Sequence, residues 1–294
     1  MFIKAIDKAT EFTRPIHSIM RGYGSSLVTP GAATLFFVNK DGWALTCKHV
    51  VNQLAAADTI SAQYKTFRIA RGTLGQGTKR KHQLRDLEKQ YGYTHTTTVE
   101  LLNAFANCIE GTLDLECRAH SSVDVALLHF RNYTRQLCTI FPMFAADGAQ
   151  LKPGKSLCRL GFPFPEFTNF EYNVAVDEIR WTTAGRTNTP QFPIDGMVTR
   201  HVADAAGSTI GFEMSTPGLR GQSGGPAFDI NGVIWGMQAA TSHLDLDFDV
   251  DTEVLRGGQK KRVRDNAFLH VGHCVHVDVL KQFMRDNGVA FQEA

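Results

Sequence analysis

A serine framed by glycines is the sharpest chemical signal in this sequence of 294 residues. Ser223 stands in the run GQSGGP at 221–226, directly before an apolar stretch. A nucleophilic serine needs an exposed hydroxyl, and two backbone N–H groups must converge where a tetrahedral oxyanion forms. Only a tight turn with small neighbours leaves room for both. The run therefore predicts Ser223 as a nucleophile and the N–H groups of Gly221 and Ser223 as an oxyanion hole.

Two further residues have the chemistry of a base and of the group that orients it. His49 ends an apolar run, and an imidazole can accept a proton near neutral pH and return it to a leaving amine. Asp124 is a single carboxylate in the apolar run 122–128, where burial without a partner would cost several kcal/mol. A hydrogen bond to His49 would satisfy this carboxylate and select the useful tautomer of the imidazole. The order His49, Asp124, Ser223 predicts a catalytic triad.

Short β-rich runs must position these side chains. Residues 34–38 and 43–46, joined by turn residues at 39–42, predict a β-hairpin. Short strands at short intervals are typical of a barrel or a sandwich. The further strands that we expect are 123–130, 156–160, 172–179, 197–202, 210–214, 226–230, 233–240 and 268–273.

Four segments depart from this strand pattern. Residues 1–25 predict a short amphipathic helix, ended by Pro15 and a turn at 22–24. Residues 73–105 hold a basic run and then a helix-compatible stretch, and predict an insertion between strands. Residues 243–266 are highly charged and predict a mobile loop. Residues 277–287 carry apolar side chains at helical spacing and predict a C-terminal amphipathic helix.

Composition limits the class of protein. Hydrophobic residues make up 43% and charged residues 20%, which is typical of globular chains. The net charge is only +2, so we expect neither nucleic acid nor a membrane as a partner. We find no signal peptide and no run of about 18 apolar residues that would span a membrane, and we expect a soluble protein. The six cysteines are scattered, which predicts free thiols and a cytoplasmic location. We expect no cofactor.

Two clusters raise the alternative of a metal site. Aspartates alternate over 245–251, but a calcium loop requires a glycine and a glutamate where Val250 and Arg256 stand. Histidines recur at 270, 273 and 276, a spacing that places neighbours on opposite faces of a strand. We therefore expect no metal.

Taken together, the motifs resemble the chymotrypsin-like serine peptidases, and most closely the trypsin-like peptidase domains of the HtrA (Deg) kind, here without a PDZ domain. The resemblance covers about residues 30–287. It rests on GWALTCKHVV at 42–51, VDVALL at 123–128, RLGFPFP at 159–165, GQSGGP at 221–226 and VHVDVL at 275–280.

The resemblance implies an all-β fold of two six-stranded antiparallel Greek-key β-barrels, with an N-terminal helical segment, a helical insertion and a C-terminal helix. The first barrel would donate His49 and Asp124 to the cleft, and the second would donate Ser223. We expect an N-terminal extension at 1–27, the first barrel at 28–140 with the insertion at about 73–105, the second barrel at 141–276, and the C-terminal helix and tail at 277–294.

The resemblance also implies how a substrate would bind. The strand Ala239, Ala240 and Thr241 would pair with the substrate backbone, and Pro217 would lie at the base of the primary pocket. Because Pro217 carries no charge, a requirement for arginine or lysine in the substrate is not expected.

Two positions depart from the pattern of the digestive enzymes. Gln222 stands where zymogen-activated trypsins have an aspartate, which excludes activation through that carboxylate. Ala239 stands where those relatives place a serine that hydrogen-bonds to the triad aspartate, so Asp124 must find its second donor elsewhere.

The expected function is that of a serine endopeptidase, which hydrolyses peptide bonds of a polypeptide substrate through an acyl-enzyme. One alternative is a catalytically quiet or self-cleaving module of the same fold that binds peptides or protein partners. An esterase-like activity is another. Control by a protein regulator through the 73–105 insertion or the 243–266 loop is a further hypothesis.

Overall fold

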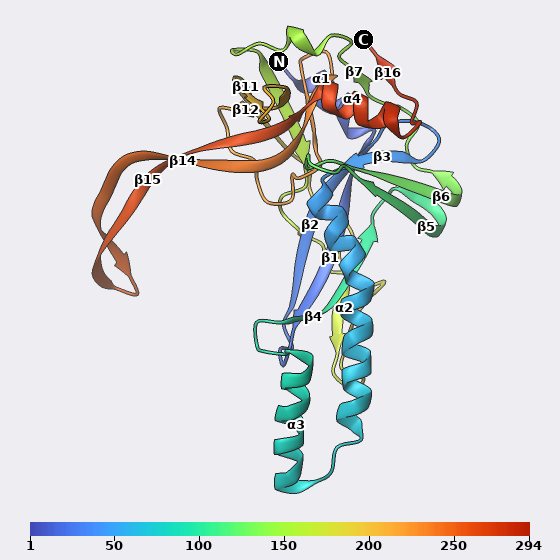
Figure 1. Ribbon diagram of the computed structural model, residues 1–294, viewed down its shortest axis with the longest axis vertical. Helices are drawn as coiled ribbons and strands as arrows, with labels where there is room; N and C mark the ends of the chain where they lie inside the picture. Colours follow the sequence, from blue (N-terminus) through green and yellow to red (C-terminus); the bar gives the residue numbers. More distant parts are fainter.

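The computed structural model describes the backbone of residues 1–294 and every side chain except that of residue 266. Strands form a body in the upper part of Figure 1, where both chain termini lie. Two long elements project from this body: a pair of helices that points downward and a two-stranded ribbon that points to the left.

Six antiparallel strands form the first barrel, in the order β4-β1-β2-β3-β6-β5. The apolar run of β2 lies in the core, where Leu35 and Phe36 are fully buried, and Phe36 pairs with Leu45 of β3. The hairpin expected from the sequence is therefore confirmed. The strands are β1 (Thr13–Gly22), β2 (Val28–Phe37), β3 (Trp43–Thr46), β4 (Thr98–Phe105), β5 (Ile109–Ala119) and β6 (Ala126–Gln136).

The N-terminal segment is helical over a shorter range than expected. Helix α1 covers only Ile3–Thr10, and residues 13–22 form β1, which pairs with β2 on one side and β4 on the other. Buried residues on both faces of β1, among them Ile16, His17 and Ile19, hide the alternation of polar and apolar residues that identifies a strand. The first barrel therefore begins before residue 28, where the sequence placed its start.

A helical hairpin interrupts the first barrel between β3 and β4. Helix α2 runs over Lys48–Gly72 and α3 over Gly77–Tyr91, so the helical insertion is confirmed but begins directly after β3 rather than at residue 73. The length of α2 is not evident from the sequence, because its buried residues are spread thinly over 25 positions. An aromatic cluster that includes Tyr64, Phe67 and Tyr93 holds the hairpin against the barrel.

The second barrel is closed. Its strands follow one another in the order β13-β8-β11-β12-β15-β14, and β13 also pairs with β14. This ring of six strands, with the first barrel, confirms the chymotrypsin-like two-barrel fold. Two short strands, β7 and β16, are added in parallel, outside the antiparallel pattern that was expected.

The expected strand 172–179 is instead the hairpin β9–β10, because the chain turns at Asp177, whose φ is 54°. Helix α4 (Val277–Asp286) confirms the C-terminal helix and buries Val277, Leu280 and Phe283. A short 3-10 turn, η1, spans Gly148–Gln150. The strands of this half are β7 (Met143–Phe144), β8 (Ser156–Gly161), β9 (Phe170–Asn173), β10 (Glu178–Trp181), β11 (Phe192–Ala203), β12 (Thr209–Met214), β13 (Pro226–Phe228), β14 (Val233–Arg256), β15 (Gln259–His276) and β16 (Gln292–Glu293).

The expectation of a loop at 243–266 is wrong. These residues belong to the ribbon of β14 and β15, whose outer part, from His243 to its partner His270, we call the arm (Figure 1). Aspartates alternate with apolar residues over 245–251, and this period of two residues is typical of a strand rather than a loop. Gly257 and Gly258 have φ values of 58° and 78°, as a tight hairpin turn requires.

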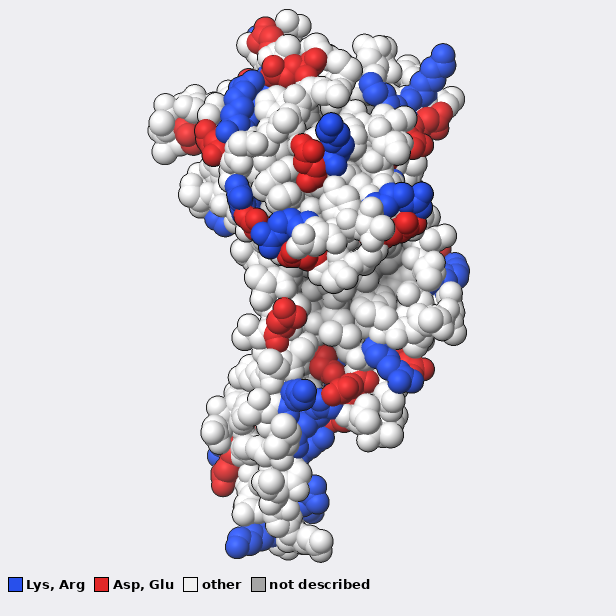
Figure 2. Space-filling view, turned by 90° about the vertical axis from the view of Figure 1, so that its right-hand side faces the viewer, with Lys and Arg blue, Asp and Glu red and all other residues white. Residues whose placement is uncertain are grey.

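Charged side chains of both signs lie side by side on the surface. On the face shown in Figure 2, lysines and arginines stand next to aspartates and glutamates over most of its length. Across the whole molecule, ion pairs such as Arg131 with Asp114 and Arg262 with Asp251 join side chains of opposite charge. The six cysteines are free, and five of them are buried. Among the described residues, no helix is long and apolar enough to cross a membrane.

The buried residue His17 should make the stability of the fold depend on pH. His17 accepts or donates a hydrogen bond with Thr189 at 2.8 Å and stacks on Phe167, and burial lowers its pKa to about 4. Below pH ~6.5 the unfolded chain takes up this proton and the folded chain does not, so folding stability falls as the pH drops from ~6.5 towards 4. The expected loss is on the order of 3 kcal/mol.

Urea unfolding of the wild type and of His17→Gln at pH 7 and pH 4 checks this prediction. Glutamine keeps a partner for Thr189 without titrating in this range, so the variant should lose less stability in acid than the wild type. The loss that remains is expected from His120, His273 and His276, whose pKa values burial also lowers. Equal losses in both proteins would contradict the assignment.

Candidate active site

The serine turn precedes β13 of the second barrel and is shaped by its glycines. Gly221 has a φ of 101° and Gly224 a φ of 89°, which other residues rarely adopt. A Cβ on Gly224 would stand 2.1 Å from the carbonyl oxygen of Thr34, so the turn touches the first barrel at a point where no side chain fits. The turn thus holds Ser223 where the two barrels meet.

Thr34 of β2 is a site residue that sequence reasoning missed. Its backbone N–H donates to the carbonyl of Ser223 at 2.9 Å, and its hydroxyl donates to the carbonyl of Gly221 at 2.8 Å. Its own carbonyl accepts from the hydroxyl of Thr46 at 2.7 Å. Thr34 therefore ties the serine turn to the strand that leads to His49. Its signal in the sequence was a hydroxyl inside an otherwise apolar run.

His49 and Asp124 meet at the N-terminus of α2. The Nδ1 atom of His49 lies 2.8 Å from Oδ2 of Asp124, and the backbone N–H of His49 donates to Oδ1 at 3.0 Å. Cys47 precedes the helix without a side-chain cap, so the Asp124 carboxylate takes that role, where the helix dipole favours a negative charge. These backbone contacts provide the donor that Asp124 required in the absence of a serine at position 239.

The environment keeps Asp124 ionised. Burial raises the pKa of this carboxyl, but hydrogen bonds from the ring and the backbone of His49 outweigh burial and hold the pKa below its ordinary value. Asp124 lies in a bend just before β6 rather than within the expected strand. About half of the His49 side chain is exposed, so the ring is open to a substrate on its other side.

The hydroxyl of Ser223 has a different partner from the one expected. It donates to the carbonyl of Ala239 at 3.3 Å, and in the part of the chain that the structure describes no hydrogen bond joins it to His49. Strand β3, which ends three residues before His49, nevertheless touches the serine turn, because a Cβ on Gly224 would stand 2.5 Å from the hydroxyl oxygen of Thr46. The three expected residues are therefore brought to one place, with the serine–histidine hydrogen bond not made.

Two backbone amides of the serine turn are free. Within the described residues, neither the N–H of Gly221 nor that of Ser223 donates to another group, whereas the N–H groups of Gln222, Gly224 and Gly225 all do. Gln222 is fully buried, and its side chain bonds to the N–H of Leu219 and the carbonyl of Phe192. The neutral side chain of Gln222 thus holds the serine turn in place without a carboxylate at this position.

A pocket of about 420 Å³ opens beside Ser223. All four residues expected from the resemblance to contact a substrate line it: Pro217, Ala239, Ala240 and Thr241. The hydroxyl of Thr241 donates to the carbonyl of Gly218 at 2.7 Å and so joins the two walls. Further lining residues that the sequence did not indicate are Gly218, Leu219, Arg220, Gln238, His243 and His270.

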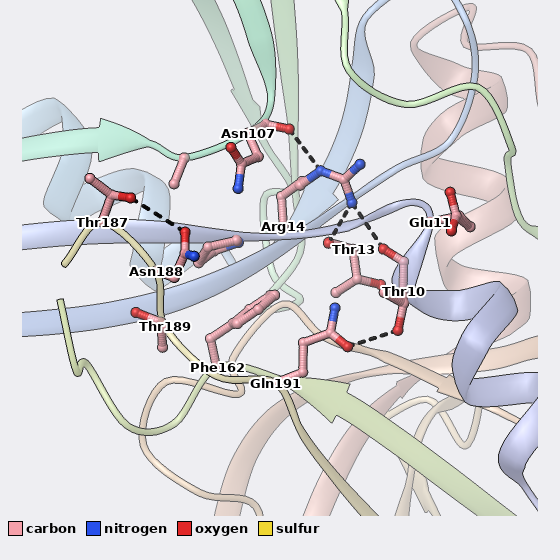
Figure 3. A pocket seen from close by; sticks show the side chains of 12 residues that line it. Thr10, Glu11, Thr13, Arg14, Asn107, Phe162, Thr187, Asn188, Thr189 and Gln191 are labelled. Atoms are coloured by element: carbon pink, nitrogen blue, oxygen red, sulfur yellow. Dashed lines mark hydrogen bonds between the residues drawn. The ribbon is translucent and has the colours of Figure 1, made fainter.

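A second hollow of about 400 Å³ lies elsewhere and has other chemistry (Figure 3). Arg14 stands at its centre and donates to backbone carbonyls of Thr10, Thr13 and Asn107. Its donors are thus occupied by the protein itself, and none of the expected site residues lines this hollow.

Three side chains near the site lie close enough together to bind a metal ion. Ligand atoms of Cys47, His49 and Asp124 lie within 4.8 Å of one another. Burial and the nearby Asp124 raise the pKa of the Cys47 thiol well above its ordinary value, and the thiol donates to the carbonyl of Gln238 at 3.3 Å. A protonated thiol beside an imidazole that already bonds to a carboxylate is a poor set of ligands.

Comparison with known proteins gives one matching family and several similar solved structures. The profile of a family described as "Trypsin-like peptidase domain" matches residues 33–237. Two solved structures of a variant of the HtrA-type protease AlgW are similar to the chain. The one with a decapeptide has 11% identity and a TM-score of 0.49 and covers 98% of this chain and 68% of the other. The one with a tripeptide has 12% identity and a TM-score of 0.49, with coverages of 97% and 62%. No curated protein matches.

Proposed function

The chain belongs to the family of trypsin-like peptidase domains, and from this premise we propose that it is a serine endopeptidase that cuts polypeptides. Ser223 is the nucleophile, His49 the general base and then the general acid, and Asp124 the residue that orients the imidazole. The observation that carries the proposal is the pairing of Asp124 with Nδ1 of His49 beside a serine turn in which the N–H groups of Gly221 and Ser223 donate to no group of the described residues.

The geometry supports each step of acyl transfer. Because the Asp124 carboxylate accepts a hydrogen bond from Nδ1–H of His49, the Nε2 atom of the neutral ring is left as the acceptor for the serine proton. The hydroxyl must first leave the Ala239 carbonyl and turn towards His49, which requires a rotation about the Cα–Cβ bond of Ser223. The serine oxygen then attacks the substrate carbonyl, and the N–H groups of Gly221 and Ser223 stabilise the oxyanion. His49 returns the proton to the leaving amine, and water repeats the sequence on the acyl-enzyme.

The pocket and the arm suggest how substrate and regulator bind. We propose that a peptide adds as a strand along Ala239, Ala240 and Thr241, with one side chain in the pocket beside Ser223. The helical hairpin α2–α3 and the arm extend away from the barrels and are the surfaces we propose for a protein regulator (Figure 1). A cytoplasmic location is also proposed, since the six cysteines are free thiols.

One observation favours a second candidate, a module of this fold that binds peptides without cutting them. The Ser223 hydroxyl donates to a backbone carbonyl rather than facing His49, as it would in a resting or quiet site.

Labelling with a serine-directed fluorophosphonate separates the two candidates. The phosphorus is attacked only by an activated serine, so we expect the wild type to be labelled and Ser223→Ala to remain unlabelled, as read by gel fluorescence and intact mass. Ser215→Ala, a serine of the same barrel outside the site, is the matched control and should label like the wild type. Absence of label on the folded wild type would favour the quiet module, and label on Ser223→Ala would remove Ser223 as the nucleophile.

A further inference from the structure

The chemistry of the pocket beside Ser223 points to the residue that it selects. Resting on the function proposed above, we infer that this pocket takes an acidic side chain, so that the enzyme cuts after glutamate or aspartate. The juxtaposition that carries the inference is a pocket lined by Arg220, His243 and His270, with the buried Arg159 behind its wall.

Cationic or hydrogen-donating groups surround the mouth of the pocket. Arg220 lies three residues before Ser223, is exposed, and forms no ion pair with any acid in the described part of the chain. No aspartate or glutamate lines the pocket. An anionic side chain that enters it therefore meets positive charge without opposition, whereas a lysine or arginine side chain would meet repulsion.

The two histidines stand at the root of the arm. His243 of β14 is the cross-strand partner of His270 of β15, and their Nδ1 atoms lie 2.5 Å apart. One Nδ1 must donate and the other must accept, so the accepting ring carries its proton on Nε2. The pair therefore offers at least one Nε2–H donor, and neither Nε2 has a partner among the described residues. The arm thus contributes to the pocket itself rather than only projecting from it.

A buried arginine supports the back wall. Arg159 of β8 is fully buried and has no carboxylate partner among the described residues. It donates to the carbonyl of Thr216 at 2.9 Å, to the carbonyl of Pro217 at 3.1 Å and to Oε1 of Gln238. Burial lowers the pKa of Arg159, yet a guanidinium stays protonated in proteins. A buried cation without a counter-ion is costly, which a purely structural wall would not require.

Arg159 also decides which end of the Gln238 amide faces the pocket. Since Oε1 of Gln238 points to the guanidinium, Nε2 lies on the other side, where it donates to the carbonyl of Ala240 at 2.6 Å and packs against Gly218. An amide nitrogen has two hydrogens, so one remains for an acceptor in the pocket. The pocket therefore offers hydrogen-bond donors from its buried wall to its mouth. A carboxylate fits such a pocket because both of its oxygens accept hydrogen bonds.

The test compares peptides of one sequence that differ only in the residue before the scissile bond, which is Glu, Gln, Leu or Lys. Glutamate and glutamine have the same shape, so their ratio isolates the charge. We expect kcat/KM for Glu to exceed that for Gln and Leu at least ten-fold, with Lys poorest. Arg220→Gln should lower the Glu-to-Gln ratio at least five-fold. Arg256→Gln removes the same charge near the tip of the arm and should leave the ratio unchanged.

Binding separates failure of this inference from failure of the proposed function. Fluorescent peptides that end in Glu, Gln or Leu are titrated into Ser223→Ala, where no hydrolysis is needed, and the Glu peptide should bind at least ten-fold tighter. Turnover that depends on Ser223 but prefers Leu, or is equal for Glu and Gln, would overturn the acidic pocket and leave the peptidase standing. Glu-selective binding without any turnover or fluorophosphonate label would support the pocket and overturn the peptidase.

Discussion

Replacing Ser223 or His49 by alanine is expected to lower peptide turnover by about 10⁶-fold, and replacing both is expected to cost little more. Without His49 the hydroxyl has no acceptor for its proton, and without Ser223 the imidazole has no nucleophile to activate. The two side chains act as one unit, so the first loss already removes the path through the acyl-enzyme. The measurement is kcat/KM for a peptide substrate in the two single variants and the double variant.

Folding is the control for these variants. His49 is half exposed, and Ser223→Ala removes only one hydroxyl, whose hydrogen bond to the Ala239 carbonyl is 3.3 Å long, so thermal unfolding should stay close to that of the wild type. Thr34→Val gives a useful contrast, since it keeps all three triad residues but removes the hydroxyl that holds Gly221. If the double variant loses the sum of the two single effects in free energy, the residues act independently and the triad assignment fails.

Asp124→Asn should lower kcat by about 10⁴-fold while leaving the fold intact. The asparagine oxygen can still accept from the backbone N–H of His49, so the cap at the start of α2 remains. Its NH₂ group then faces Nδ1 of His49, which must become an acceptor, and the ring proton moves to Nε2. A proton on Nε2 leaves His49 unable to accept from Ser223.

Two measurements check this account. The chemical shifts of the ring nitrogens in ¹⁵N-histidine-labelled protein should show the change of tautomer at His49, and the rate of fluorophosphonate labelling should fall with kcat. Asp147→Asn, which alters the cap of η1 away from the site, is the matched control for the loss of one carboxylate. More than a tenth of the wild-type turnover in Asp124→Asn would remove Asp124 from the mechanism.

Local sequence was enough to indicate the residues with chemistry. Glycines on either side of a serine indicate a turn that no other residues tolerate, and the positive φ values of Gly221 and Gly224 follow from that requirement. A lone carboxylate in an apolar run demands a partner, and His49 is the partner that it has. The hairpin of β2 and β3 and the helix α4 were also predictable, because each has an unambiguous period and clear ends.

Other elements could not be predicted from the sequence, because their patterns of polar and apolar residues depend on the elements that pack around them. The strand β1 has buried residues on both faces, so its period of two is invisible until β2 and β4 are in place beside it. The many charged residues of the arm favour a loop when the sequence is considered alone. In the structure they form cross-strand ion pairs, such as Arg262 with Asp251, which stabilise a two-stranded ribbon in water. The helix α2 has too few buried residues for its length, so its sequence shows no clear helical periodicity.

Sequence alone was enough to predict His49, Asp124 and Ser223 as a triad in that order, because each motif is local and its chemistry belongs to the residue type. Tertiary structure decided everything that requires two distant segments to meet. Thr34 reaches the serine turn across 187 positions of sequence, and the Asp124 carboxylate caps a helix that begins 76 residues earlier. The pocket joins Arg220 to a histidine pair on two strands, with Arg159 behind it. No local pattern encodes such contacts, since they form only when segments that are distant in the sequence have packed together.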